Sequence, residues 1–391
     1  MSAKREQTER KSAPIGVFDS GVGGLTVARE IMRQIPNERL VYFGDTARVP
    51  YGNKSKETVT KFSRQIVRFL ETQNVKAIVV ACNTASAYAL DEIEQELDIP
   101  VIGVVKPGAK VAVSGFEHNA VTRPLHALNA QLIVCGRRLF DQEDTLSDFR
   151  RALRTGVDAA VFTHVSNVFG CILPVKDMAA LCRSYGVPFI VDAAQSAGVL
   201  PVELAGWGAD FIAMPGHKGL LGPQGTGLLL CAGEAQPLLY GGTGSQSLMQ
   251  TMPEELPERL EPGTVNVPGA AGLLAGMQAV ERLGMEAIAA REAALAKKCA
   301  AGLKKMGMEV FSGENQGGTV SFRAGCGCEE AAQMLSDRGF ALRAGLHCAP
   351  LAHESAGTVD TGTVRVSFGW HSTAGELNAF LRAARSLPPA V

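Results

Sequence analysis

The sequence predicts an α/β protein made of two consecutive α/β parts and a small C-terminal α+β domain. Strand and helix patterns alternate over the first hundred residues, which is typical of a parallel sheet covered by helices. From about residue 106 a second series of strand patterns begins, again separated by helical stretches. The length of 391 residues allows two or three domains, because single cores rarely exceed about 250–300 residues.

The first part contains four strand patterns and three helical patterns. In order they are a strand at 15–18, a helix at 25–34, a strand at 40–43, a helix at 56–73, a strand at 77–81, a helix at 86–97 and a strand at 100–105. Polar residues follow three of these strands, at 19–20, 44–45 and 82–84. Ligands of parallel sheets bind beyond the carboxyl ends of the strands, so we expect a site at this edge.

The second part continues with strands, a long loop and a final domain. The expected strands are 132–134, 159–163, 189–192, 211–214 and 227–230. Residues 233–268 are rich in glycine and proline and predict a functional loop, and residues 269–305 predict a long helical connection. Strands at 319–323, 341–344 and 363–368, with helices near 329–337 and 374–386, predict the α+β domain. The expected boundaries are a disordered tail at 1–13 and domains at 14–112, 113–285 and 286–391.

Composition excludes several classes of function. The formal net charge is −1 and no basic block is long enough for a nucleic-acid surface. No run approaches the roughly 18 apolar residues of a membrane span. The nine cysteines are scattered, and Cys326 and Cys328 form the only close pair, so we expect no metal site. Free thiols without an export signal predict a reducing cytoplasm.

Four N-terminal segments carry a specific resemblance. They are IGVFDSGVGGLTV (15–27), GDTARVPYG (44–52), ACNTAS (81–86) and PVIGVVKPG (100–108). Together they resemble the first domain of glutamate racemase over roughly residues 14–113. The resemblance implies that Cys82 is one of two acid/base thiols and that the amino-acid site is lined by Asp19, Ser20, Tyr51, Gly52, Asn83 and Thr84.

The racemase chemistry raises an objection. Cofactor-independent racemisation needs two proton-transfer groups on opposite faces of the α-carbon. In the family the second thiol lies in a GCTHYP stretch, which this sequence lacks. Cys171, in FGCILP (169–174), has no Thr-His pair beside it, and we interpret it as a buried structural cysteine.

A second set of motifs points to different chemistry. It includes FEHNAVTRPL (116–125), THVSNVFG (163–170), VDAAQSAG (191–198) and AMPGHKGLLGPQG (213–225). Lys218 lies in a glycine-rich turn where an aldehyde cofactor could form a Schiff base, and Asp192 suits the partner of a protonated pyridine nitrogen. His118 could stack on the cofactor ring, with Asn167 and Gln195 bonding its phenolic oxygen. Taken singly, an exposed lysine, a strand-end aspartate and a satisfied histidine are the ordinary interpretations.

In this order and spacing, with GGTGSQS (241–247), EPGTVN (261–266), GLHCAP (345–350) and VRVSF (364–368), the motifs resemble the class V aminotransferase family. Cysteine desulfurases and selenocysteine lyases are the specific resemblance, over residues 117–391. It implies a truncated fold-type I transferase that binds pyridoxal 5'-phosphate, acts on an amino acid, forms a homodimer and passes sulfur to an acceptor protein.

The same resemblance assigns further roles. Cys348 is the nucleophile that takes sulfur, and Arg365 grips the substrate carboxylate. His217 lies beside the cofactor with Lys218, and Thr243 and Ser245 reach its phosphate, across a dimer interface. Ionisation of the Cys348 thiol needs nearby positive charge, which we expect from residues such as His347 or Arg343.

The join between the two resemblances leaves three hypotheses open. Family members carry a phosphate-binding N-terminal segment that is absent here, where racemase sequence stands instead; the join lies within residues 106–114. Residues 80–90 form a strand, polar turn and helix start that could replace it, with Thr84 and Ser86 as donors. The three hypotheses are that the chain is a cysteine desulfurase, that it is a glutamate racemase supplying cell-wall precursors, and that it is an inactive chimera.

Overall fold

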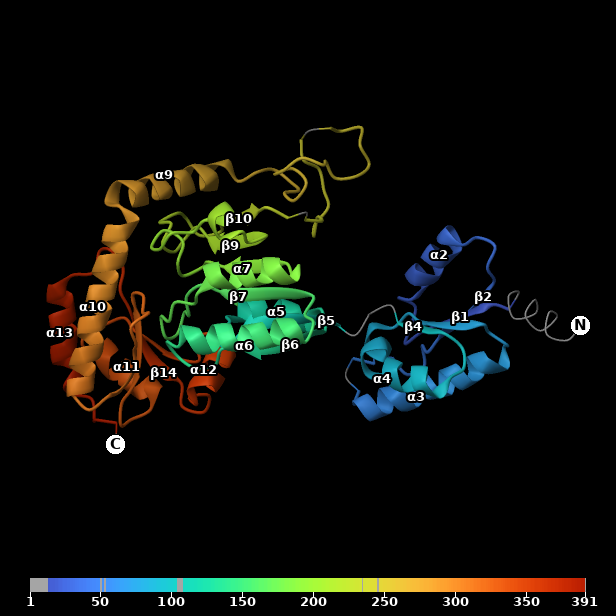
Figure 1. Cartoon of the computed structure of the whole chain (residues 1–391), viewed down its shortest axis with the longest axis horizontal. Coiled ribbons are helices and arrows are strands. Elements are labelled where there is room, and N and C mark those ends of the chain that lie inside the picture. The colour runs from blue at the N-terminus through green and yellow to red at the C-terminus, as the bar shows by residue number, and fades with distance from the viewer. Residues whose placement is uncertain are drawn as a thin grey trace, which may run out of the picture. The chain divides into compact units, whose positions relative to one another are not determined.

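The computed structural model describes residues 13–49, 51–52, 54–103, 108–233, 235–244 and 246–390. The chain divides into two compact units (Figure 1). The first unit runs to Ala109 and includes Leu128–Gln131, and the second contains Lys110–Ala127 and Leu132–Val391. The division between Ala109 and Lys110 falls inside the segment in which the two resemblances meet.

The first unit is a parallel sheet with helices on both faces. Its described elements are β1 (Ile15–Asp19), α2 (Leu25–Gln34), β2 (Leu40–Gly44), α3 (Lys56–Thr72), β3 (Ala77–Val80), α4 (Asn83–Glu96) and β4 (Val101–Gly103). The strands pair in the order β2-β1-β3-β4, all parallel. Successive residues of a strand face opposite sides of its sheet. Accordingly, Val17 packs near α2, and Phe18 packs against α3 and α4, on the other side in Figure 1.

Most of these elements confirm the sequence prediction. Helix α2 has the predicted bounds, and each described strand begins within one residue of its predicted start. Helix α4 begins at Asn83, three residues before the prediction, because Cys82 caps it: the thiol accepts a bond from the Ala85 N–H at 3.4 Å. The predicted end of the last strand, residues 104 and 105, lies outside the described residues.

The second unit is built on a larger mixed sheet. Its first elements are β5 (Gly108–Ser114), α5 (Asn119–Ala127), β6 (Ala130–Cys135), α6 (Gln142–Arg154), β7 (Ala159–Thr163), α7 (Val175–Tyr185), β8 (Phe189–Asp192), α8 (Leu204–Trp207), β9 (Phe211–Pro215) and β10 (Gly227–Cys231). The described strands pair in the order β10-β9-β8-β7-β5-β6. Strands β5, β7, β8 and β9 are parallel, and β10 is antiparallel to β9. Phe149, Phe162 and Phe189 stack against one another in its core.

Two helices connect this sheet to the last domain. The described part of residues 233–266 contains neither helix nor strand, which confirms the predicted loop. The sequence predicted one long helical connection at 269–305. The structure instead has two helices, α9 (Val267–Leu283) and α10 (Met285–Lys305). It breaks at Gly284, whose φ of 80° lies outside the helical region.

The C-terminal part forms a small domain around its own core. Its elements are β11 (Glu309–Phe311), β12 (Thr319–Arg323), α11 (Cys328–Ser336), β13 (Arg343–Gly345), α12 (Pro350–Ala356), β14 (Thr363–Ser367) and α13 (Ala374–Ala384). The described strands pair antiparallel in the order β11-β12-β14-β13. Leu303, Phe322, Leu335 and Phe380 are buried between this sheet and its helices. Residues of β12 and β14 line a large cavity of the second unit.

Candidate active site

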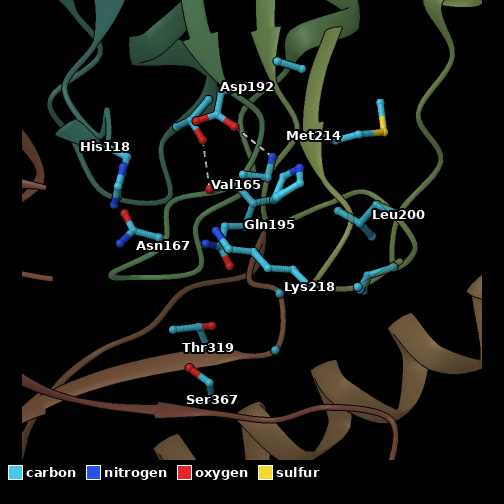
Figure 2. Close-up of a pocket in the computed structure, with 18 of the residues that line it drawn as sticks. His118, Val165, Asn167, Asp192, Gln195, Leu200, Met214, Lys218, Thr319 and Ser367 are labelled. Atoms are coloured by element: carbon cyan, nitrogen blue, oxygen red, sulfur yellow. Dashed lines mark hydrogen bonds between the residues drawn. The ribbon is translucent and has the colours of Figure 1, made fainter. Parts of the chain in front are cut away.

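A cavity of about 1600 Å³ lies within the second unit. Residues at the carboxyl ends of β7, β8 and β9 form one wall, which agrees with the usual position of ligands on parallel strands. Figure 2 shows Asp192, Gln195 and Lys218 on this side, with Thr319 of β12 and Ser367 of β14 facing them. Two segments more than a hundred residues apart therefore form one site.

Lys218 and Asp192 form an electrostatic pair in this cavity. Asp192 ends β8, and Lys218 lies in the turn after β9, with its side chain exposed to the cavity. Burial by the surrounding protein lowers the pKa of Lys218, and the Asp192 carboxylate partly opposes this effect. Burial raises the pKa of Asp192, against the 2.8 Å hydrogen bond from the Ala194 N–H and the charge of Lys218. A positive charge placed beside Asp192 would favour its ionised form.

His118 lies at the start of α5 and lines the same cavity. Its Nδ1 accepts a hydrogen bond from the Ala120 N–H at 3.0 Å, so a neutral ring carries its proton on Nε2. Burial, with the nearby charge of Lys218, lowers the pKa of His118. A neutral imidazole suits stacking on an aromatic ring.

A hydrogen-bonded group joins the loop after β7 to the small domain. The Asn167 amide donates to the His347 carbonyl at 2.8 Å, and Arg365 donates from Nη1 to the Asn167 carbonyl at 2.9 Å. Asn167 Oδ1 and Arg365 Nε are buried without a hydrogen-bond partner among the residues described. Since buried polar atoms are rarely left unpaired, these two atoms mark a place for a polar ligand.

Cys348 is exposed and lines the cavity. Its backbone is left-handed, with φ of 58°, and its carbonyl accepts the Asn119 N–H at 2.7 Å, which ties it to the start of α5. The expectation that His347 supplies positive charge is wrong: burial lowers the pKa of His347 to about 4, so it is neutral at pH 7. Arg365, which also lines the cavity, interacts electrostatically with Cys348, and Arg343 lines the same cavity.

The residues present fit part of a pyridoxal phosphate site. A lysine, a carboxylate, a neutral imidazole and an unpaired buried amide oxygen surround one space, and Gln195 and His217 also line it. Thr243 is not among the described residues lining the cavity, and Ser245 lies outside the described residues.

Sequence reasoning missed two buried acids beside this site. Glu117 is fully buried, and burial raises its pKa to about 8 although Ser114 and the Thr163 N–H bond its Oε1. Glu292, on α10, lines the cavity, and burial raises its pKa to about 7. Glu117 is part of the Glu-His-Asn motif, and this motif could have indicated it as a site residue. Glu292 is not part of any motif.

The racemase-like residues gather separately in the first unit. The Cys82 thiol donates to Ser20 Oγ at 3.3 Å, and Ser20 lies 3.5 Å from the Asp19 carboxylate. Tyr51 is buried and donates to Asp45, an interaction that raises the pKa of Tyr51 after the larger effect of burial.

The other expected members of this group have fewer contacts. Thr84 is half-buried near the start of α4, and Gly52 lies in a turn with open space around its α-carbon. Asn83 begins α4, but its side chain lies outside the description. Ser86, which the sequence suggested as a phosphate donor, is buried, and its hydroxyl donates to the Val80 carbonyl at 2.9 Å.

Neither a metal-ligating cluster nor a membrane-spanning helix is found among the described residues. No cluster of three or more metal-ligating side chains is found there. Among the same residues, none of the helices combines the length and apolarity required to cross a membrane. Cys171 is 1% exposed, and burial raises its pKa to about 12, which agrees with a structural cysteine.

Comparisons with known proteins assign the chain to a family. The model of the class-V aminotransferase family matches residues 30–380, and the chain belongs to this family. A cysteine desulfurase from Thermococcus onnurineus NA1 is similar in structure, with TM-score 0.65, 32% identity and 72% coverage of each chain. The cysteine desulfurase CsdA from Escherichia coli has the same fold, with TM-score 0.62, 22% identity, and 94% of this chain and 93% of that chain covered. Members of the family use pyridoxal phosphate.

Curated glutamate racemases match a shorter stretch at higher identity. The racemase of Oceanobacillus iheyensis is 58% identical over 107 residues, which is 27% of this chain and 39% of the racemase. That of Geobacter metallireducens is 60% identical over 100 residues, covering 26% and 37%. The chain therefore spans less than half the length of these relatives. The composite nature read from the sequence is consistent with both sets of matches.

Proposed function

We propose that the protein is a pyridoxal-phosphate-dependent cysteine desulfurase, converting L-cysteine to L-alanine with transfer of sulfur to Cys348. The observation that carries the proposal is the meeting of Lys218, Asp192, Cys348 and Arg365 in one cavity. No two of these residues adjoin in sequence, and each has a distinct task in this reaction. The similarity to the Thermococcus onnurineus desulfurase supports the same assignment.

Different residues of the cavity would bind and orient the cofactor and the substrate. Lys218 would hold the cofactor aldehyde, since its lowered pKa favours the neutral, nucleophilic amine. Asp192 would hold a proton on the pyridine nitrogen, His118 would cover the ring, and the second N–H of Asn167 would reach the phenolic oxygen. When bound, pyridoxal phosphate withdraws electrons from the substrate α-carbon. Arg365 would bind the substrate carboxylate, using its unpaired Nε.

Sulfur transfer follows from the position of Cys348 at the cavity surface. The thiolate of Cys348 attacks the substrate sulfur and forms an S–S bond. The substrate Cβ–S bond breaks with its electron pair remaining on carbon, and a proton from Lys218 or solvent completes alanine. The balance is L-cysteine and a thiol giving L-alanine and a persulfide, with no external oxidant. An acceptor protein would then remove the sulfur, and a homodimer would be the functional form.

The decisive experiment uses the full chain incubated with pyridoxal phosphate. Borohydride reduction followed by peptide mass spectrometry should place a cofactor adduct on Lys218, absent from Lys218→Ala and kept in the exposed control Lys297→Ala. L-cysteine should then yield alanine and a persulfide at Cys348. Cys348→Ser should abolish both products, whereas Cys326→Ser, away from the cavity, should not. Absence of the Lys218 adduct at saturating cofactor refutes the proposal.

A second candidate, glutamate racemase, is favoured by the Asp19–Ser20–Cys82 group and the identity to racemases. Its weakness is chemical, because one thiol can serve one face of the α-carbon only. We expect the full chain to show no interconversion of D- and L-glutamate by chiral chromatography. Interconversion that disappears in Cys82→Ala would favour the racemase instead.

A further inference from the structure

The cavity is larger than one cofactor and one amino acid require. Ligand pockets usually measure about 300–1,000 Å³, whereas this one measures about 1600 Å³. Part of the extra wall comes from α10, through Ile288, Ala289, Glu292 and Ala293, which we call the α10 wall. Apart from Glu292 this wall is apolar.

Glu292 is an acid without a partner. Its exposure is 8%, and no hydrogen bond or ion pair links it to any residue that the structure describes. Burial alone raises its pKa to about 7, so no neighbouring charge compensates it. A buried polar group costs free energy unless it is bonded, and this carboxyl lines a cavity where a ligand can reach it.

The surroundings keep Glu292 unpaired. Arg291, next to it in sequence, is turned away and donates from Nε and Nη2 to the Ser372 carbonyl at 3.0 and 2.9 Å. A Cβ added to Gly318 would lie 2.7 Å from Glu292 Oε2 and 3.0 Å from its Cβ. Glycine at 318 therefore leaves room for the carboxyl, and no cation among the described residues pairs with it.

We propose that the α10 wall is a second ligand subsite, in which Glu292 binds the cationic end of an apolar stem, an alkylguanidinium or alkylammonium group. The apolar residues of the wall cover the stem, and the carboxylate receives the charged N–H donors. The group can belong to a free amine or to an arginine or lysine side chain of a polypeptide. The inference does not depend on cofactor binding or on desulfuration.

The test is calorimetric titration of the full chain with n-butylguanidinium and with n-butylurea, its neutral analogue of the same shape. Neither probe reacts with an aldehyde, so cofactor chemistry cannot contribute. A charge-assisted hydrogen bond predicts about tenfold to hundredfold tighter binding of the guanidinium. Glu292→Gln should abolish this preference, and Glu286→Gln, exposed on the same helix, should retain it.

Two outcomes overturn the proposal. One is equal binding of the two probes to the wild-type chain, which needs no variant to fold. The other is an undiminished preference in Glu292→Gln, which would place the cation elsewhere, for example at Asp192. N-acetylarginine amide distinguishes the source of the ligand: tighter binding than butylguanidinium indicates a polypeptide side chain, and weaker binding indicates a free amine.

Discussion

The protonation of Glu117 makes a sharp prediction about how stability depends on pH. The fully buried carboxyl is bonded at Oε1 by the Ser114 hydroxyl and by the Thr163 N–H at 2.8 Å, and its Oε2 has no partner among the described residues. Burial raises its pKa from 4.5 to about 8, with the Asp192 charge acting in the same direction. Glu117 is therefore mostly protonated at pH 7 in the folded chain and ionised in the unfolded one.

The sign of the effect follows from proton linkage. Below pH 4.5 the carboxyl is protonated in both the folded and the unfolded state, so Glu117 does not lower the free energy of unfolding. Between pH 4.5 and about 8 only the unfolded state loses the proton, so stability falls by about 1.4 kcal/mol per pH unit. From pH 5.5 to 7.5 this amounts to about 3 kcal/mol, on the order of a quarter or more of a typical domain stability.

Glu117→Gln removes the titration and isolates this slope. Glutamine adds a roughly constant cost of about 1–3 kcal/mol, because its amide has two N–H donors without an acceptor where the protonated carboxyl has one O–H. Urea unfolding at pH 5.5, 6.5 and 7.5 measures both contributions, using the two tryptophans, Trp207 and Trp370, which lie in the second unit. The stability advantage of the wild type over the variant should shrink by about 1.4 kcal/mol per unit. A difference that stays constant with pH would refute the reasoning.

Two further substitutions test the site and the fold. Arg365→Lys should raise the KM for L-cysteine about tenfold or more with a smaller change in kcat, because lysine cannot bond both the Asn167 carbonyl and a carboxylate in planar geometry; steady-state kinetics showing an unchanged KM would contradict this. Gly198→Ala should destabilise the second unit by about 3 kcal/mol or more in urea, because φ is 82° and a Cβ would lie 2.2 Å from the Gly219 carbonyl oxygen; a variant as stable as wild type would show that the turn can move.

The sequence predicted most of the strands but not the strand that lies at the join. β7 and β8 have the predicted bounds because each is an apolar run ended by polar residues. β5 was missed because Gly108–Ser114 was interpreted as the join, although it lies between β7 and β6 in the larger sheet. The break at Gly284 was missed because a single glycine is often tolerated inside a helix.

The motifs indicated which residues share the cavity, whereas their protonation could not be predicted from the sequence. Motifs identified Lys218, Asp192 and Cys348, and the structure brings them to one cavity. The charge assigned to His347 was wrong because it depends on burial, which leaves this ring 4% exposed between Thr363 and the cavity. Glu292 escaped notice because an acid in a helical pattern usually faces solvent, and only tertiary packing turns it inward.

The contribution of the phosphate group to cofactor affinity tests the effect of the missing phosphate-binding segment. Phosphate groups are normally held by several charge-assisted hydrogen bonds worth about 1.5–3 kcal/mol each. The expected donor Thr243 is not among the described residues that line the cavity, and the Ser86 hydroxyl is engaged with Val80. At protein concentrations at which the chain is monomeric, we therefore expect pyridoxal phosphate to bind less than about tenfold more tightly than pyridoxal, a difference under about 1.4 kcal/mol. The measurement is titration of the visible absorbance at several protein concentrations. A preference of a hundredfold or more at low concentration would show that one chain holds the phosphate, whereas a preference that grows with concentration would show that a partner subunit supplies the donors.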